Sequence, residues 1–165
     1  MIRYLTPLFL LVLSTSVYAL SDCGDDYDKC LALLKIAEKT VEKNPYDENK
    51  SYPDDYPANN MYLYSGIIDN FAKKVPLKFK TNDKNLALAV RAYVFYNKIQ
   101  GHNDFFSIAP FKRLWCHTGK KDTSKILRAV DNILRKDQKL KKLFREAIRE
   151  CGSCKTPNMC EHSEE

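Results

Sequence analysis

The residues best suited to chemistry lie near the C-terminus, where residues 151–162 read CGSCKTPNMCEH. Three cysteines and His162 in this segment could bind zinc, which takes four nitrogen or sulfur ligands in tetrahedral geometry. The spacing matches no common zinc module, so we expect no metal site. Cys151 and Cys154 also form a CxxC pair, but redox pairs use the positive N-terminus of a helix. This pair follows a predicted helix, where the dipole has the opposite sign, so we expect no redox site.

The two other histidines give no catalytic arrangement. His117 is adjacent to Cys116, but neighbouring residues seldom point toward each other, and Cys116 is needed for an even number of disulfide partners. His102 follows Gly101, which is predicted to end a helix, and it belongs to a polar turn. The chain contains no HExxH, GxSxG or phosphate-binding glycine loop. The sequence therefore predicts a protein without catalytic residues, cofactor or metal.

Two segments could instead bind a partner. The first is the basic run 135–149, which is either a solvated helix face or a contact for an anionic lipid, a glycan or an acidic protein surface. The second is the loop 44–59, NPYDENKSYPDDYPAN, which is either a mobile acidic linker or a tyrosine contact surface, since loops this long are functional or disordered. The candidate partner-binding residues are Lys136, Lys139, Lys141, Lys142, Arg145, Tyr46, Tyr52 and Tyr56.

The distribution of charge along the chain is uneven and has two possible explanations. Residues 22–59 carry ten acidic and five basic side chains, whereas residues 60–150 carry eight acidic and twenty basic ones. The acidic head and the basic body could neutralise each other, or the body could present a basic face to an acidic partner. Most aromatic residues occur at core spacing, so we expect no nucleic-acid partner.

The N-terminus has the pattern of a secretory signal peptide over residues 1–19. Arg3 precedes a short apolar run at 5–13, and Ala19 is the small residue expected just before the cleavage site. The apolar run is about half the ~20 residues that span a bilayer. We therefore predict an exported chain, 20–165, that forms one domain without a transmembrane segment and reaches the extracellular space or a bacterial periplasm.

All six cysteines follow this cleavage site, and an even number in an exported chain predicts three disulfides. They are Cys23, Cys30, Cys116, Cys151, Cys154 and Cys160. If the first helix reaches back to Cys23, the Cα atoms of Cys23 and Cys30 lie roughly 10 Å apart, beyond the usual limit of about 7 Å. A Cys151–Cys154 bond would join nothing distant. We therefore expect each C-terminal cysteine to pair with one of the three others, which leaves six pairings open.

The apolar periodicity predicts an all-α, compact bundle of about five to six helices stapled by three disulfides. The final apolar stripe is interrupted by a polar stretch near Lys136, so we favour two helices there over one long helix. A Cys-rich tail, 152–165, follows. The predicted helices span about 25–43, 60–75, 82–100, 107–117 and 123–151.

Residues that start and stop helices set these boundaries. We expect N-caps at Asp25 or Asp26, at Thr81 or Asn82, and at Asp137, because short polar side chains there precede apolar stripes. Pro110 should fall in the first turn of its helix, the part of a helix where proline is tolerated.

Six cysteines on a helical exported scaffold broadly resemble insect odorant-binding and venom proteins, although no cysteine lies between Cys30 and Cys116. The stretch from Tyr62-Leu63-Tyr64-Ser65-Gly66 to Leu114-Trp115-Cys116 is similar to small periplasmic immunity proteins. Our leading hypothesis is an exported, non-enzymatic binding protein, a venom-type or host-directed effector acting on an extracellular protein or a membrane target. The alternatives are a periplasmic inhibitor that blocks a toxin enzyme, and a helical carrier of a small apolar ligand.

Overall fold

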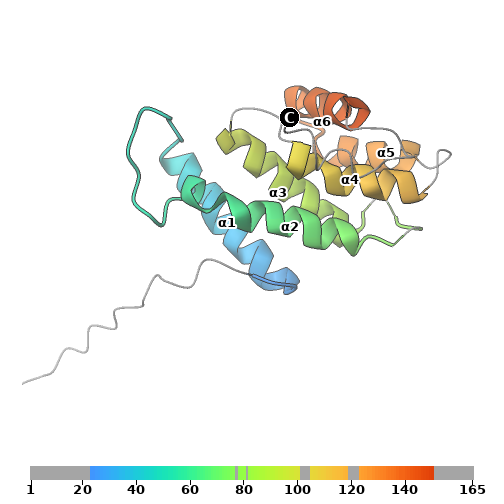
Figure 1. The fold of residues 1–165 in the computed structure, drawn as a ribbon, viewed down its shortest axis with the longest axis horizontal. Helices are drawn as coiled ribbons and strands as arrows, with labels where there is room; N and C mark the ends of the chain where they lie inside the picture. The colour runs from blue at the N-terminus through green and yellow to red at the C-terminus, as the bar shows by residue number, and fades with distance from the viewer. Residues whose placement is uncertain (1–22, 77, 81, 101–104, 119–122, 151–165) are drawn as a thin grey trace, which may run out of the picture.

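The structure, a computed structural model, describes residues 23–76, 78–80, 82–100, 105–118 and 123–150. These residues form only helices and their connections (Figure 1), which confirms the predicted all-α class. The helices are α1 (Tyr27–Lys43), η1 (Pro57–Asn60), α2 (Met61–Lys73), α3 (Lys84–Gln100), α4 (Phe105–Thr118), α5 (Thr123–Ile133) and α6 (Gln138–Glu150). The predicted signal peptide and the Cys-rich tail lie outside the described residues. Within the described part, no helix has both the length and the apolar character needed to cross a bilayer.

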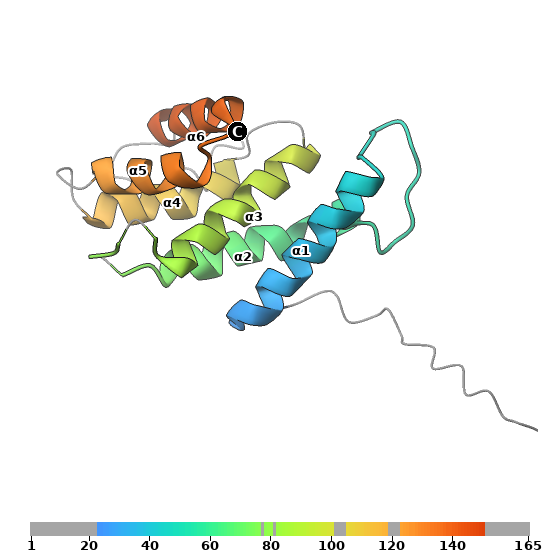
Figure 2. The same ribbon diagram turned by 180° about the vertical axis from the view of Figure 1, so that it is seen from behind.

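Helix α3 is the centre of the bundle. Ten of its 17 residues are buried, from Leu86 to Ile99, because neighbouring helices cover it on several sides. Helix α2 packs along α3 and also contacts α4, while α5 packs on another side of α3 and α6 covers α4. Helix α1 contacts α3 at one edge of the bundle and runs in roughly the same direction (Figures 1 and 2). This arrangement leaves one face of α3 between α1 and the end of α5.

Three aromatic rings join the central helix to α4 and α6. Tyr93, Phe111 and Phe144 are almost fully buried, and their ring centroids lie 5.1–5.7 Å apart with interplanar angles of 72–87°. Edge-to-face contacts of this kind are favourable because the positive edge of one ring meets the negative face of another. Nearby, the buried Lys112 Nζ donates to the Ile148 carbonyl at 2.8 Å. Burial lowers the pKa of Lys112.

Helix α1 has the predicted apolar stripe. Cys30, Leu34, Ala37 and Val41 are buried. The N-cap is Asp26, one of the two predicted residues, whose Oδ1 accepts a hydrogen bond from the Lys29 amide at 3.0 Å. The helix therefore begins at Tyr27 and does not reach back to Cys23.

This late start overturns the predicted disulfide rule. Cys23 and Cys30 pair with each other, with 5.0 Å between their Cα atoms. Gly24 adopts a φ of +51°, which glycine tolerates because it lacks a Cβ, and the Asp26 amide donates to the Cys23 carbonyl at 3.2 Å. The chain thus turns before α1 begins, whereas the predicted rule depended on the condition that the first helix reaches back to Cys23. Cys116 is also disulfide-bonded, and its partner lies outside the described residues.

Two expected boundaries of α3 and α4 were wrong by a few residues. The N-cap of α3 is Asp83 in place of Thr81 or Asn82, because the Asp83 Oδ1 accepts from the amides of Asn85 and Leu86 at 2.9 and 3.0 Å. Helix α4 begins at Phe105, so Pro110 lies beyond the first turn. Proline has no N–H to donate to the carbonyl four residues earlier, so α4 lacks one hydrogen bond at this position.

The expected break near Lys136 is confirmed. Helix α5 ends at Ile133 and α6 begins at Gln138, with a turn between them. Asp137 is the predicted cap, since its Oδ1 accepts from the Leu140 amide at 2.9 Å. The turn brings α6 back across the bundle, so that Phe144 and Ile148 reach the core.

Candidate functional sites

The three tyrosines of the loop between α1 and η1 form one stack. The ring centroids of Tyr52 and Tyr56 are 4.0 Å apart, and Tyr46 lies 5.6 Å from Tyr52 and 6.4 Å from Tyr56. All three ring pairs are within 29° of parallel. The sequence suggested a tyrosine contact surface but could not show that the rings would stack.

Hydrogen bonds fold the loop back onto the end of α1. The Tyr56 hydroxyl donates to the Asn44 carbonyl at 2.7 Å, and the Tyr52 hydroxyl donates to the Pro45 carbonyl at 2.9 Å. The Tyr52 oxygen also accepts from the Asp47 amide at 2.8 Å. Because the tyrosine side chains bond to backbone groups, they take the place of the regular helix or strand bonds that this segment lacks. These bonds tie the loop to the residues that follow α1.

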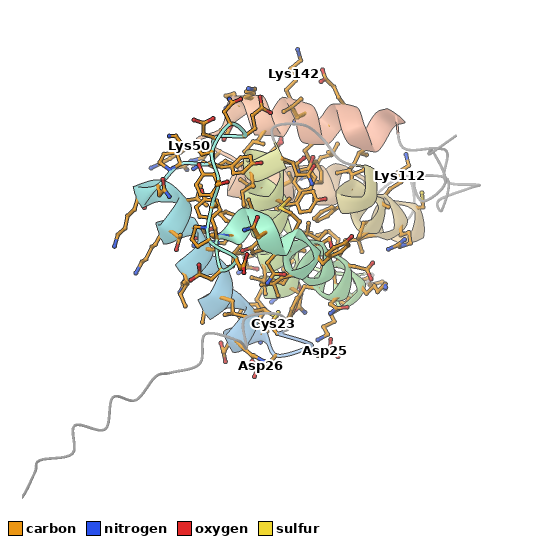
Figure 3. The ribbon with its side chains drawn as sticks, turned by 60° about the vertical axis from the view of Figure 1, so that its left-hand side comes forward. Cys23, Asp25, Asp26, Lys50, Lys112 and Lys142 are labelled. Atoms are coloured by element: carbon orange, nitrogen blue, oxygen red, sulfur yellow. A yellow bond between two sulfur atoms is a disulfide. The ribbon has the colours of Figure 1, made fainter. Side chains whose placement is uncertain are left out.

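The stack is buried at one end and exposed at the other. Tyr56 is 3% exposed and Tyr46 is 41% exposed, with Tyr52 between them in burial. Burial, and then the neighbouring Tyr52 and Tyr46, raise the pKa of Tyr56. The carboxylates of Glu48, Asp54 and Asp55 are exposed on the same loop. Residues 44–56 are hereafter called the acidic tyrosine loop; Figure 3 marks its position at Lys50.

The predicted basic residues do not form a single cationic face. Lys141 and Arg145 turn inward toward Asp131 of α5, with Lys141 Nζ 3.5 Å from a carboxylate oxygen. Lys142 is exposed and lies 3.7 Å from Glu146 on its own helix. Lys136 and Lys139 are exposed. Three of the five bases therefore have an acidic neighbour, and binding of an anionic surface by this run stays a prediction.

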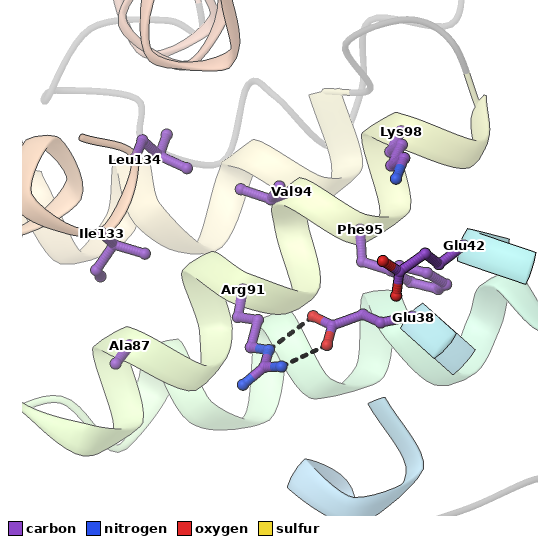
Figure 4. A pocket seen from close by; sticks show the side chains of 9 residues that line it. All are labelled: Glu38, Glu42, Ala87, Arg91, Val94, Phe95, Lys98, Ile133 and Leu134. Atoms are coloured by element: carbon purple, nitrogen blue, oxygen red, sulfur yellow. Dashed lines mark hydrogen bonds and ion pairs between the residues drawn. The ribbon is translucent and has the colours of Figure 1, made fainter. Parts of the chain in front are cut away.

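A groove that the sequence did not predict lies between α1, α3 and the end of α5. It encloses about 590 Å³. Figure 4 shows α3 as its floor, α1 on one side and the α5–α6 turn on the other. It is lined by Glu38, Glu42, Ala87, Arg91, Val94, Phe95, Lys98, Ile133 and Leu134.

Charged side chains gather on the α1 side of this groove. Arg91 donates to Glu38 through two nitrogens, with Nε 2.6 Å from Oε1, and this hydrogen bonding raises the pKa of Arg91. Glu42 lies one turn beyond Glu38, and Lys98 lies about two turns beyond Arg91. Both are exposed. The only signal in the sequence was the spacing of lining residues along α3, which could not show what α1 would place opposite them.

The candidate cysteine–histidine chemistry finds no support at Cys116, which is disulfide-bonded and so carries no thiol. His102, His162, Cys151, Cys154 and Cys160 lie outside the described residues. No known protein family, curated protein or solved structure matches this chain.

Proposed function

We propose that the chain is an exported binding protein that acts on a protein target outside the cell and performs no catalysis. The observation that carries this proposal is the acidic tyrosine loop. Its stack is anchored by buried Tyr56 and ends in the exposed ring of Tyr46. A loop of this length without regular structure is more often functional when it is held in place.

Physical chemistry supports such a loop as a contact surface. Tyrosine supplies a large, rigid and amphipathic area with only two side-chain torsions to restrain. The hydrogen bonds of Tyr52 and Tyr56 fix the ring positions before a partner arrives, which lowers the entropic cost of association. Tyr46 can therefore contribute apolar area with little further ordering.

The charge of the loop specifies the partner. Glu48, Asp54 and Asp55 are exposed, so a complementary protein surface is basic. Complementary charge raises the association rate and excludes like-charged competitors. An effector of a basic extracellular protein and an inhibitor of an enzyme with a basic cleft both satisfy this requirement.

Affinity capture from the natural target fluid, followed by binding measurements with the isolated partner, tests the proposal. We expect Tyr46→Ala to weaken binding at least tenfold, because the exposed ring is the apolar centre of the contact. The double variant Asp54→Lys and Asp55→Lys should weaken it as well and flatten its salt dependence, since exposed charges are screened over about 8 Å at physiological ionic strength.

The matched control makes the same change in charge elsewhere, at Asp28 and Glu146, and should bind as the wild type does. Equal affinity of the wild type, the Tyr46 variant and the loop double variant would contradict the proposal. Loss of the partner's enzymatic activity on binding would identify the inhibitor form, and retention would identify the effector form.

A further inference from the structure

We propose that the groove between α1, α3 and α5 binds a single-chain amphiphile with a zwitterionic head, such as a monoacyl phosphocholine. This site is separate from the acidic tyrosine loop and does not depend on the function proposed there. Its volume of about 590 Å³ lies within the range of roughly 300–1,000 Å³ that is typical of small-molecule sites.

The groove has the length for an extended chain. Its floor residues on α3 run from Ala87 to Lys98, eleven residues apart, which corresponds to about 16 Å along a helix. They recur at spacings of three and four, so they lie along one side of α3. Figure 4 shows this side of α3 facing the groove.

One part of the groove is apolar. Ala87 and Val94 of α3 face Ile133 and Leu134 at the end of α5 across it (Figure 4). The Ile133 side chain is 37% exposed, although it lies beside buried Leu134. An aliphatic chain laid between these residues would remove apolar surface from water on both sides, which is favourable in proportion to the area buried.

The other part of the groove carries balanced charge. Glu38, Glu42, Arg91 and Lys98 are two acids and two bases. Glu38 and Arg91 satisfy each other. Glu42 and Lys98 stand on facing helices, and neither makes an ion pair within the described residues. A cationic group beside Glu42 and an anionic group beside Lys98 would match both.

This balance distinguishes a zwitterion from singly charged amphiphiles. A fatty acid would pair with Lys98 and place its charge near the acids of α1, and an alkylammonium would pair with Glu42 and face Lys98. In a zwitterionic head, the cationic group can lie beside Glu42 and the anionic group beside Lys98, so each charge has a neighbour of opposite sign. The occupant is one free molecule and not a bilayer, because a groove of about 590 Å³ has the size of a site for one small molecule.

Calorimetric titration of the full exported protein with monoacyl phosphocholines below their micelle concentrations tests the proposal. Fatty acids and alkyltrimethylammonium ions of the same chain length serve as probes of the head. We expect saturable binding that tightens by up to about fourfold per added methylene, from ~0.8 kcal/mol for each CH₂ buried, until the chain outgrows the groove. The phosphocholine should bind at least tenfold more tightly than either singly charged probe.

Groove variants localise the binding. Val94→Trp fills the groove and should abolish binding while the helical circular dichroism spectrum is retained. Glu42→Gln and Lys98→Gln do not touch the core, and each should reduce the preference for the zwitterion. The matched control replaces the exposed pair on α6, Lys142→Gln with Glu146→Gln, and should bind as the wild type does.

Three results would overturn the proposal: no saturable binding of any phosphocholine, binding that persists in the Val94 variant, or equal affinity for the fatty acid and the phosphocholine. If the Val94 variant fails to fold, the variants Glu42→Gln and Lys98→Gln decide the outcome. The preference for the zwitterion must fall in these two variants and not in the control.

Discussion

Tyr64 shows how one buried phenol affects the stability of the whole chain. It lies on α2 with 3% of its surface exposed, and its ring meets Phe95 of α3 edge-on at 4.8 Å. Burial raises the pKa of Tyr64 above its ordinary value of 10.0, because the phenolate would lose its hydration without gaining a partner of opposite charge. The folded chain therefore keeps this proton when the unfolded chain has released it.

We predict that Tyr64→Phe removes part of the alkaline instability. Above about pH 10 the unfolded chain binds fewer protons than the folded chain, so the free energy of unfolding falls as pH rises. One such group contributes a slope of up to ~1.4 kcal/mol per pH unit. Urea unfolding between neutral pH and pH 11 should show a shallower decline in the variant.

Tyr62 provides the control for this experiment. It is on the same helix but is 92% exposed, so Tyr62→Phe should leave the alkaline slope unchanged. Parallel alkaline slopes for the Tyr64 variant and the wild type would show that Tyr64 ionises in the folded chain as it does in the unfolded one.

At the scale of elements, the caps explain which boundaries the sequence could predict. Asp137 precedes an apolar stripe and has no other good cap beside it. Asp26 also precedes an apolar stripe, and its main competitor is the neighbouring Asp25. Before α3, three short polar residues follow one another, and all of them are good caps. Only the path of the backbone decides that the Asp83 carboxylate reaches the amides of Asn85 and Leu86.

We predict that Asp83→Ala destabilises the fold by about 1 kcal/mol, because two amides in the first turn of α3 lose their acceptor. Thermal or urea unfolding measures this loss. Asn82→Ala changes the neighbouring residue, one of the two that the sequence analysis expected as the cap, and should cost only a few tenths of a kcal/mol. If the Asn82 variant were the less stable of the two, the assignment of the cap to Asp83 would be wrong.

The candidate sites were less accessible to sequence reasoning than the helices. The tyrosines of the loop attracted notice through composition, but their stacking depends on hydrogen bonds to Asn44 and Pro45. Glu38 and Arg91 are 53 residues apart, and their meeting depends on how α1 packs against α3. Helix periodicity identifies buried faces and says nothing about which exposed faces meet across a groove.

At the scale of the whole molecule, the chain has both a local disulfide and a long-range one. Cys23 and Cys30 are joined across seven residues, whereas Cys116 bonds to a cysteine outside the described residues. Since Cys23 and Cys30 are occupied, we predict that Cys116 pairs with one of the three C-terminal cysteines and that the other two pair with each other.

Non-reducing peptide mapping of the protein, purified without reductant, checks this prediction. It should yield one Cys23–Cys30 peptide, one peptide linking Cys116 to the tail, and no free thiol. A free thiol among the tail cysteines, or a link from the tail to Cys23 or Cys30, would contradict it.

The Cys23–Cys30 link also has a consequence for the order in which the chain oxidises. In an exported chain these two cysteines enter the oxidising compartment long before Cys116 and the tail, because export proceeds from the N-terminus. The Gly24 turn and the first turns of α1 that hold them together are local, so the bond can close before the bundle assembles. Closing it early leaves four cysteines with three possible connectivities in place of fifteen. Early formation of the Cys23–Cys30 disulfide would thus reduce the number of wrong cysteine pairings that the chain can form during synthesis.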